Sequence, residues 1–141
     1  MSTYKRLLNE LKQLELPYVI KAIENGFIIN FIYKKSDITI KYSDVYPFKP
    51  PKQIHINNMN IMTIYKNIMV KNNDIKNCLC CSSILCEYNW SIQYNIKYNI
   101  INEIDNIFKY SKYYIYKRLL NLIADKYTTQ DISYIYPYLL I

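Results

Sequence analysis

The chain has 141 residues, 51% of them hydrophobic, which is enough apolar material for one substantial core. A single glycine and five prolines exclude a flexible linker of any length, so we expect one domain over residues 1–141. The formal net charge of +7 attracts polyanions in general, but the lysines and arginines are scattered, and we do not expect nucleic acid as the partner.

The N-terminus and the cysteines bear on location. Residues 1–6 lack the apolar core of a signal peptide, and no apolar run approaches the roughly 20 residues that a membrane span requires. All four cysteines fall between Cys78 and Cys86, whereas a secreted disulfide framework joins distant segments. We therefore expect a soluble intracellular protein with reduced thiols, in the cytoplasm or the nucleus, with no membrane partner.

An amphipathic helix is predicted over residues 2–14, because leucines recur there at helical spacing. Either Ser2 or Thr3 can cap its first turn. The helical stretch ends before Pro17. The opposite face carries charged residues, namely Lys5, Arg6, Glu10 and Lys12.

An antiparallel meander of strands is predicted next. Short runs of β-branched, aromatic and other apolar residues occupy positions 18–23, 27–33 and 38–42. Residues 24–26 and 34–37 separate these runs as turns. A fourth short strand, over residues 53–56, follows a proline-rich segment and completes a four-stranded sheet.

The second half of the chain is predicted to be irregular at first and then helical. Residues 57–77 show no clear period and are expected to form an ordered loop. Three helices follow. The first is a buried helix marked by Ile96, Ile100, Ile104, Ile107 and Phe108; the second is marked by Tyr116, Leu119, Leu120 and Ile123; the third runs from Thr128, with Asp131 in its capping box, through Ile135. The predicted class is α+β.

Two motifs carry a resemblance to a known family. The first is Tyr46-Pro47-Phe48-Lys49-Pro50-Pro51-Lys52, a stiff excursion that leaves the third strand. The second is Cys81-Ser82-Ser83-Ile84-Leu85, followed by Trp90-Ser91. In this order they resemble the Tyr-Pro…Pro-Pro and Cys-Leu-Asp-Ile-Leu…Trp-Ser-Pro motifs of ubiquitin-conjugating enzymes. One extra residue lies before Trp90, and Ile92-Gln93 replaces the family's Pro-Ala.

The resemblance implies the fold and the chemistry of that family. It implies that Cys81 accepts ubiquitin or a ubiquitin-like modifier as a thioester and passes it to a lysine, because a thiolate is both a nucleophile and a good leaving group. No cofactor is implied. The implied partners are the modifier, an activating enzyme and a ubiquitin ligase.

An asparagine that steadies the oxyanion is also implied, since the family has His-Pro-Asn before its cysteine. Asn73 stands at the family's spacing, after Lys71 and Asn72. A second alignment, over Ile64-Tyr65-Lys66-Asn67-Ile68, gives Asn67 the role instead. Histidine and proline are missing from both, and the choice between the two asparagines stays open.

Partner-binding positions are carried over only where residues match. Lys5 and Arg6 lie on the first helix, where family members meet the activating enzyme. Phe48 and Pro50 in the proline-rich segment, and Ser91 after the tryptophan, match the surface that meets a ligase. For each residue the plain alternative is a solvated charge or a loop residue held against the core.

Three alternatives remain from the sequence. One is a catalytically silent variant of the same fold that acts as a binding scaffold, suggested by the missing His-Pro. Another is a small zinc site of Cys78, Cys80, Cys81 and Cys86, although the adjacent pair bends poorly round one ion. A cysteine protease would need a base, and the only histidine, His55, falls in the fourth predicted strand.

Overall fold

The structure is a computed structural model that describes residues 2–71 and 82–124, with side chains for residues 2–68 and 82–112. The chain divides into two compact units, Met1–Ile107 and Phe108–Ile141. The first unit holds the sheet and most of the helices. The described part of the second unit is helical throughout.

The first helix, α1, spans Thr3–Leu14 and agrees with the prediction. Ser2 is its N-cap, since the Ser2 hydroxyl accepts a hydrogen bond of 3.2 Å from the backbone N–H of Lys5. The helix ends at Glu15, whose φ of 58° is left-handed. Leu7 and Leu11 are fully buried, so the leucine face packs into the core.

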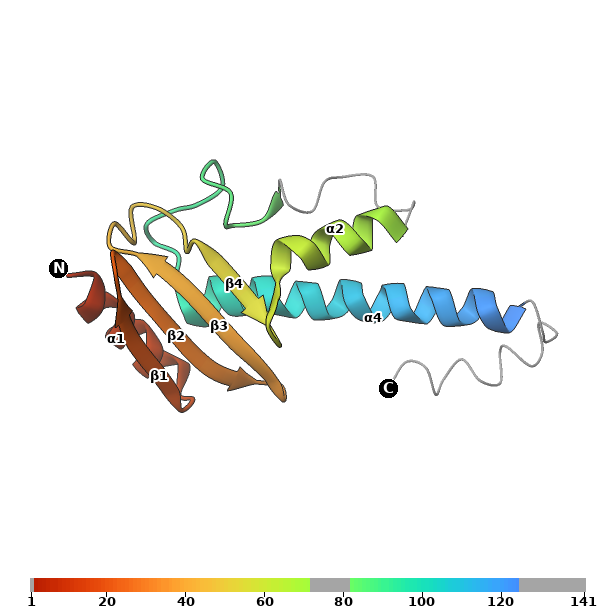
Figure 1. Ribbon diagram of the computed structural model, residues 1–141, viewed down its shortest axis with the longest axis horizontal. Helices are drawn as coiled ribbons and strands as arrows, with labels where there is room; N and C mark the ends of the chain where they lie inside the picture. The colour runs from red at the N-terminus through yellow and green to blue at the C-terminus, as the bar shows by residue number, and fades with distance from the viewer. Residues whose placement is uncertain (1, 72–81, 125–141) are drawn as a thin grey trace. The chain divides into compact units, whose positions relative to one another are not determined.

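An antiparallel sheet follows with the strands in sequence order (Figure 1). The strands are β1 (Tyr18–Ile23), β2 (Gly26–Tyr33), β3 (Ser36–Ser43), β4 (Gln53–Ile56) and β5 (Met59–Asn60). The four predicted strands are confirmed, and the general α+β class fits. The prediction of a four-stranded sheet is wrong by one short strand, because β5 pairs with β4.

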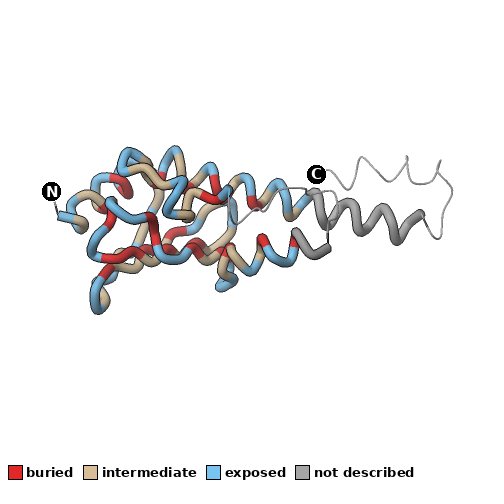
Figure 2. Tube along the Cα trace, turned by 90° about the horizontal axis from the view of Figure 1, so that it is seen from above, coloured by how far each residue is buried: buried red, intermediate tan, exposed pale blue. Residues whose placement is uncertain are grey.

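The core of the first unit lies against one face of this sheet. Side chains on alternate positions of β2, β3 and β4 are buried, as a sheet with one covered face requires. They are Ile29, Phe31, Ile38, Ile40, Tyr42, Ile54 and Ile56. Figure 2 shows buried stretches in both the strands and the helices of this part of the chain.

The loop predicted over residues 57–77 is wrong as far as residue 71. Asn57 and Asn58, both with positive φ, form the turn into β5, and helix α2 spans Ile61–Lys71. The Asn60 side chain accepts from the backbone N–H of Met62 at 2.9 Å and so caps the helix start. The turn and the cap were hidden because asparagine is common along the whole chain. Residues 72–77 lie outside the described residues.

The helix after Trp90 begins as a π-helix over Ile96–Ile100 and continues as α4, Ile101–Ala124. Asn95 caps it by accepting from the backbone N–H of Tyr98 at 2.9 Å. The predicted buried face is confirmed at Ile96, Ile100, Ile104 and Ile107, and Phe108 is half-buried.

The prediction of a separate second helix marked by Tyr116, Leu119, Leu120 and Ile123 is wrong, because α4 runs unbroken to Ala124. No glycine or proline interrupts residues 101–124, so nothing in the backbone ends the helix earlier. The predicted last helix, Thr128 to Ile135, lies outside the described residues. In the part of the chain that the structure describes, no helix combines the length and the apolar character that a membrane span needs.

Candidate functional site

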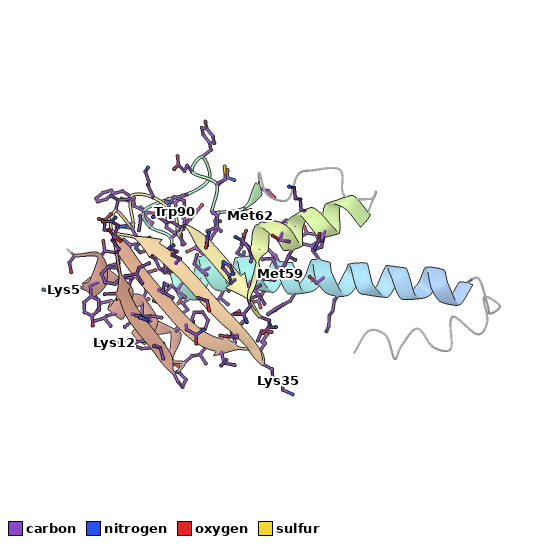
Figure 3. All side chains as sticks on the ribbon, viewed as in Figure 1. Lys5, Lys12, Lys35, Met59, Met62 and Trp90 are labelled. Atoms are coloured by element: carbon purple, nitrogen blue, oxygen red, sulfur yellow. The ribbon has the colours of Figure 1, made fainter. Side chains whose placement is uncertain are left out.

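The proline-rich segment and the tryptophan that follows the cysteines meet in the folded chain. The indole Nε1 of Trp90 donates a hydrogen bond of 2.8 Å to the backbone carbonyl of Pro47. Trp90 lies beside the loop between β3 and β4 (Figure 3). The Tyr46–Pro47 peptide bond is cis, and the ring centroids of Tyr46 and Trp90 are 5.8 Å apart. The two motifs are therefore in direct contact across 43 residues of sequence.

A buried carboxylate, Glu10, ties α1 to this contact. The Tyr46 hydroxyl lies 2.9 and 2.8 Å from the two carboxylate oxygens, and the backbone N–H of Ile96 donates to Oε1 at 3.0 Å. Burial raises the pKa of Glu10, with Tyr46 and Arg6 opposing that effect. Burial and the neighbouring carboxylate also raise the pKa of Tyr46. Glu10 thus joins the first helix, the proline-rich segment and the start of the π-helix.

Arg6 belongs to the same network. Its Nε donates to Glu10 at 3.2 Å, and its Nη2 donates to the carbonyl oxygens of Ile92 at 2.6 Å and Tyr94 at 2.8 Å. The guanidinium carbon lies 5.4 Å from the centre of the Tyr46 ring. The alternative of a solvated charge at Arg6 does not hold, because its side chain binds the backbone of another segment. Glu10, on the same charged face of the helix, likewise binds groups of other segments.

The segment that follows Cys81 in the sequence is anchored by a second buried carboxylate, Glu103. The Ser83 hydroxyl donates to Glu103 Oε1, and the Tyr65 hydroxyl donates to the same oxygen at 2.5 Å. Ser83 and Glu103 are 2% and 7% exposed. One carboxylate oxygen of the long helix therefore holds both α2 and the segment that follows Cys81.

A hollow of about 380 Å³ lies between the proline-rich segment and residues 85–87. Its lining mixes apolar and charged side chains, with Lys49 Nζ 4.0 Å from Glu87 Oε1. The residues that line it are Ser43, Val45, Lys49, Pro50, Pro51, Lys52, Leu85 and Glu87. Since Lys49 and Glu87 are largely exposed, their ion pair contributes little stability.

The candidate acceptor itself falls outside the described residues. So do Cys78, Cys80 and Asn73, and the description resumes at Ser82, directly after Cys81. Asn67 lies on α2 with an exposed side chain. Cys86 is a half-buried free thiol, and the residues that the structure describes contain no group of three or more metal-binding side chains.

The predicted partner-binding residues differ in exposure. Lys5 is exposed on α1, and Phe48 is 78% exposed. Pro50 is buried and forms part of the hollow rather than of an open surface. Ser91 is half-buried, with its hydroxyl accepting from the backbone N–H of Gln93 at 3.3 Å. Ile92, which stands where the family has proline, is 52% exposed.

Histidine 55 lies on β4, opposite Thr39 of β3, with Nε2 3.3 Å from the Gln53 side-chain oxygen. It is a strand residue, as predicted.

The sequence did not assign Glu103, Ser83 or Tyr65 to the site. The one available signal was Glu103 itself, a carboxylate one residue before Ile104 on the predicted buried face.

Comparisons of the chain with protein-family models, with curated proteins and with solved structures find no match.

Proposed function

We propose that this protein is a conjugating enzyme of the ubiquitin type, with Cys81 as the residue that carries the modifier. The observation that carries the proposal is the hydrogen bond from Trp90 Nε1 to the Pro47 carbonyl, 2.8 Å long. It joins the two segments whose sequences resemble the family's motifs. The first segment lies between β3 and β4, the second comes after the last strand, and both precede the long helix, as the resemblance requires.

The chemistry proposed for Cys81 is two successive acyl transfers. Its thiolate attacks the thioester carbonyl of the modifier on the activating enzyme, so that a new C–S bond forms and the activating enzyme's thiolate leaves. The amine of a substrate lysine then attacks the Cys81 thioester. An amide C–N bond forms, the C–S bond breaks, and the amine loses a proton to solvent or to a base. Neither step needs a cofactor or a redox partner.

The partner surface is proposed at exposed residues that neighbour the Arg6 and Trp90 network in the sequence. Lys5 offers a charge on α1, while Phe48 and Ile92 offer exposed apolar side chains. Thr3 Oγ1, 2.9 and 2.8 Å from the carbonyl oxygens of Asp44 and Tyr46, adds a further link between α1 and the proline-rich segment. A surface built on linked segments loses little conformational freedom when an activating enzyme or a ligase binds.

The second candidate function is a catalytically silent scaffold of the same fold. The position of Asn67 favours it, because this residue lies within a regular helix with an exposed side chain, so the family's His-Pro-Asn has no replacement there. Asn73 remains the other candidate for the oxyanion role. A scaffold would bind the modifier or a ligase through the same exposed residues without forming a covalent bond.

The test incubates the purified chain with activating enzyme, ATP and ubiquitin or a ubiquitin-like modifier. The proposal expects an adduct that thiol reductants remove, that is lost in Cys81→Ser and that persists in Cys80→Ser. The adjacent cysteine is the matched control, because both substitutions replace sulfur by oxygen in neighbouring residues. If no adduct forms with any modifier while binding to modifier or ligase persists, the silent scaffold is favoured.

The zinc alternative has its own measurement. A site of Cys78, Cys80, Cys81 and Cys86 would give one zinc per chain in the purified protein, and chelation would unfold it. The thioester proposal expects no stoichiometric zinc and the same melting temperature with and without chelator.

A further inference from the structure

Residues 83–90 form a short loop that is anchored at both ends. At its end, Trp90 Nε1 donates to the Pro47 carbonyl. At its start, Ser83 is buried against Glu103. Between these anchors, Glu87 and Tyr88 are exposed, Tyr88 by 98%. In the sequence Cys81 stands two residues before Ser83, so the first anchor is close along the chain to the candidate acceptor.

At this first anchor, several hydrogen bonds meet at Ser83. The backbone N–H of Leu85 donates to the Ser83 hydroxyl oxygen at 3.1 Å, and the Ser83 hydroxyl donates to Glu103. The Ser83 carbonyl accepts from the backbone N–H of Cys86 at 3.1 Å and from the Asn89 side-chain amide at 3.0 Å. Ser83 therefore organises the turn, and Glu103 holds the orientation of its hydroxyl.

Glu103 is suited to this role because it accepts from two buried hydroxyls at once. Tyr65 donates from α2 at 2.5 Å and Ser83 donates from the loop, both to Oε1. An apolar side chain at position 103 would leave both hydroxyls without this acceptor in a buried place, which costs more than the bonds alone. A glutamine keeps an oxygen at the same place and can accept both.

We propose that Glu103 is a positioning residue that holds residues 83–90 in the conformation that the reaction at Cys81 requires. The role in the reaction rests on the proposed function. The anchoring of the loop stands on the hydrogen bonds alone.

Amide hydrogen exchange of the full chain tests the anchoring. In Tyr65→Phe and in Glu103→Leu, the amides of Leu85 and Cys86 should exchange about tenfold faster. A tenfold change corresponds to about 1.4 kcal/mol, close to the free energy lost when one hydrogen bond to a carboxylate is removed. Neither substitution touches those amides directly. Glu103→Gln should restore exchange close to that of the wild type.

The matched control is Tyr33→Phe. It also removes a tyrosine hydroxyl that donates to a carboxylate of α4, here Asp105 at 2.9 Å, but at a place away from the loop. It should leave the Leu85 and Cys86 amides unchanged. If Glu103→Leu fails to fold, Tyr65→Phe carries the test, because it removes a single oxygen.

Two results would overturn the anchoring role. One is unchanged exchange at Leu85 and Cys86 in Tyr65→Phe. The other is an increase spread evenly over the loop and the sheet amides, which would make Glu103 a general stabiliser. Alkylation of the half-buried Cys86 thiol is a second measurement. The rate of alkylation should rise together with the exchange rate of the Cys86 amide.

The thioester assay separates this inference from the proposed function. Tyr65→Phe should lower kcat for adduct formation about tenfold and leave KM for the loaded activating enzyme unchanged, while Glu103→Gln behaves as the wild type. If the wild type forms no adduct but the exchange pattern holds, the conjugating function is wrong and the anchor stands. If the adduct forms at the wild-type rate in Tyr65→Phe, the positioning role is wrong and the conjugating function stands.

Discussion

The only glycine of the chain, Gly26, lies at the start of β2, opposite Ser43 of β3. A Cβ atom at this position would lie 2.0 Å from the carbonyl oxygen of Tyr42, which is backbone and cannot rotate away. The side chain of Tyr42 is itself fully buried, so β3 has little room to shift. Glycine is therefore required here by close approach of two strands rather than by backbone dihedral angles.

Gly26→Ala is expected to lower the free energy of unfolding by about 2 kcal/mol or more, since the clash forces the strands apart. Denaturant titration followed by circular dichroism measures it. Asn25→Gly is the control, because Asn25 has a φ of 60° and glycine relieves that conformation. Equal stability of Gly26→Ala and the wild type would show that the two strands are less closely packed here.

Glu10 gives the stability a defined pH dependence. Burial raises its pKa above the ordinary value of 4.5, so the folded state holds the proton more tightly than the unfolded state does. The stabilisation by this group is complete below pH 4.5 and is lost as pH rises through the raised pKa. The Glu10→Gln variant has no titrating group at this position, so its stability lacks this pH dependence. The difference in unfolding free energy, wild type minus variant, should therefore fall as pH rises above 4.5, and a difference that rises would contradict the assignment.

The tight turns between strands hold non-glycine residues at positive φ, a conformation that strains the backbone. Lys34 and Lys35 join β2 to β3 with φ values of 49° and 65°, in a region that favours glycine or asparagine. Lys34 also pairs with Asp105 at 2.9 Å, so its side chain has a second role. Lys35 is exposed and makes no ion pair with any residue that the structure describes, so it is the position to change.

Lys35→Gly is expected to raise the free energy of unfolding by about 0.5–1 kcal/mol, because glycine adopts positive φ without strain. The midpoint of urea denaturation measures the gain. Lys21→Gly, the same substitution within β1, should instead destabilise, since glycine weakens a strand. A lower midpoint in Lys35→Gly would show that the lysine side chain contributes more than the strain costs.

Some elements can be predicted from the sequence pattern and others cannot. β1 and β4 were predicted with their observed bounds, because apolar residues and turn residues alternate clearly there. Helix α2 was missed because its turn and cap are asparagines, which this chain also uses elsewhere. At the site, the proline-rich segment and Trp90 were recognised from local motifs. Glu10 and Glu103 were not, since their partners are distant in sequence and only the fold brings them together.

Within the first compact unit, segments from three parts of the chain are joined by polar groups as well as by the core. Arg6 and Glu10 of α1 bind the backbone near Ile96 and the hydroxyl of Tyr46, and Trp90 binds Pro47. Buried networks of this kind specify one arrangement because every broken bond leaves a group without its partner. The proposed site therefore depends on contacts made across the whole unit.

Trp90→Phe tests this dependence. Phenylalanine keeps an aromatic ring but has no N–H to donate to Pro47, so the unfolding free energy should fall by about 1–2 kcal/mol. The thioester should form more slowly than in the wild type. Phe27→Leu, in which an aromatic side chain of β2 is shortened, is the stability control and should leave the thioester rate unchanged. An unchanged thioester rate in Trp90→Phe would separate the tryptophan from the reaction.

The most direct measurement of the central claim is mass spectrometry of the protein after reaction with activating enzyme, ATP and modifier. We predict one modifier per chain, attached through a bond that hydroxylamine cleaves, with peptide fragmentation placing the linkage on Cys81 and not on Cys78, Cys80 or Cys86. Attachment at Cys86, attachment through a stable amide alone, or an unmodified chain under conditions that load a known conjugating enzyme would contradict it.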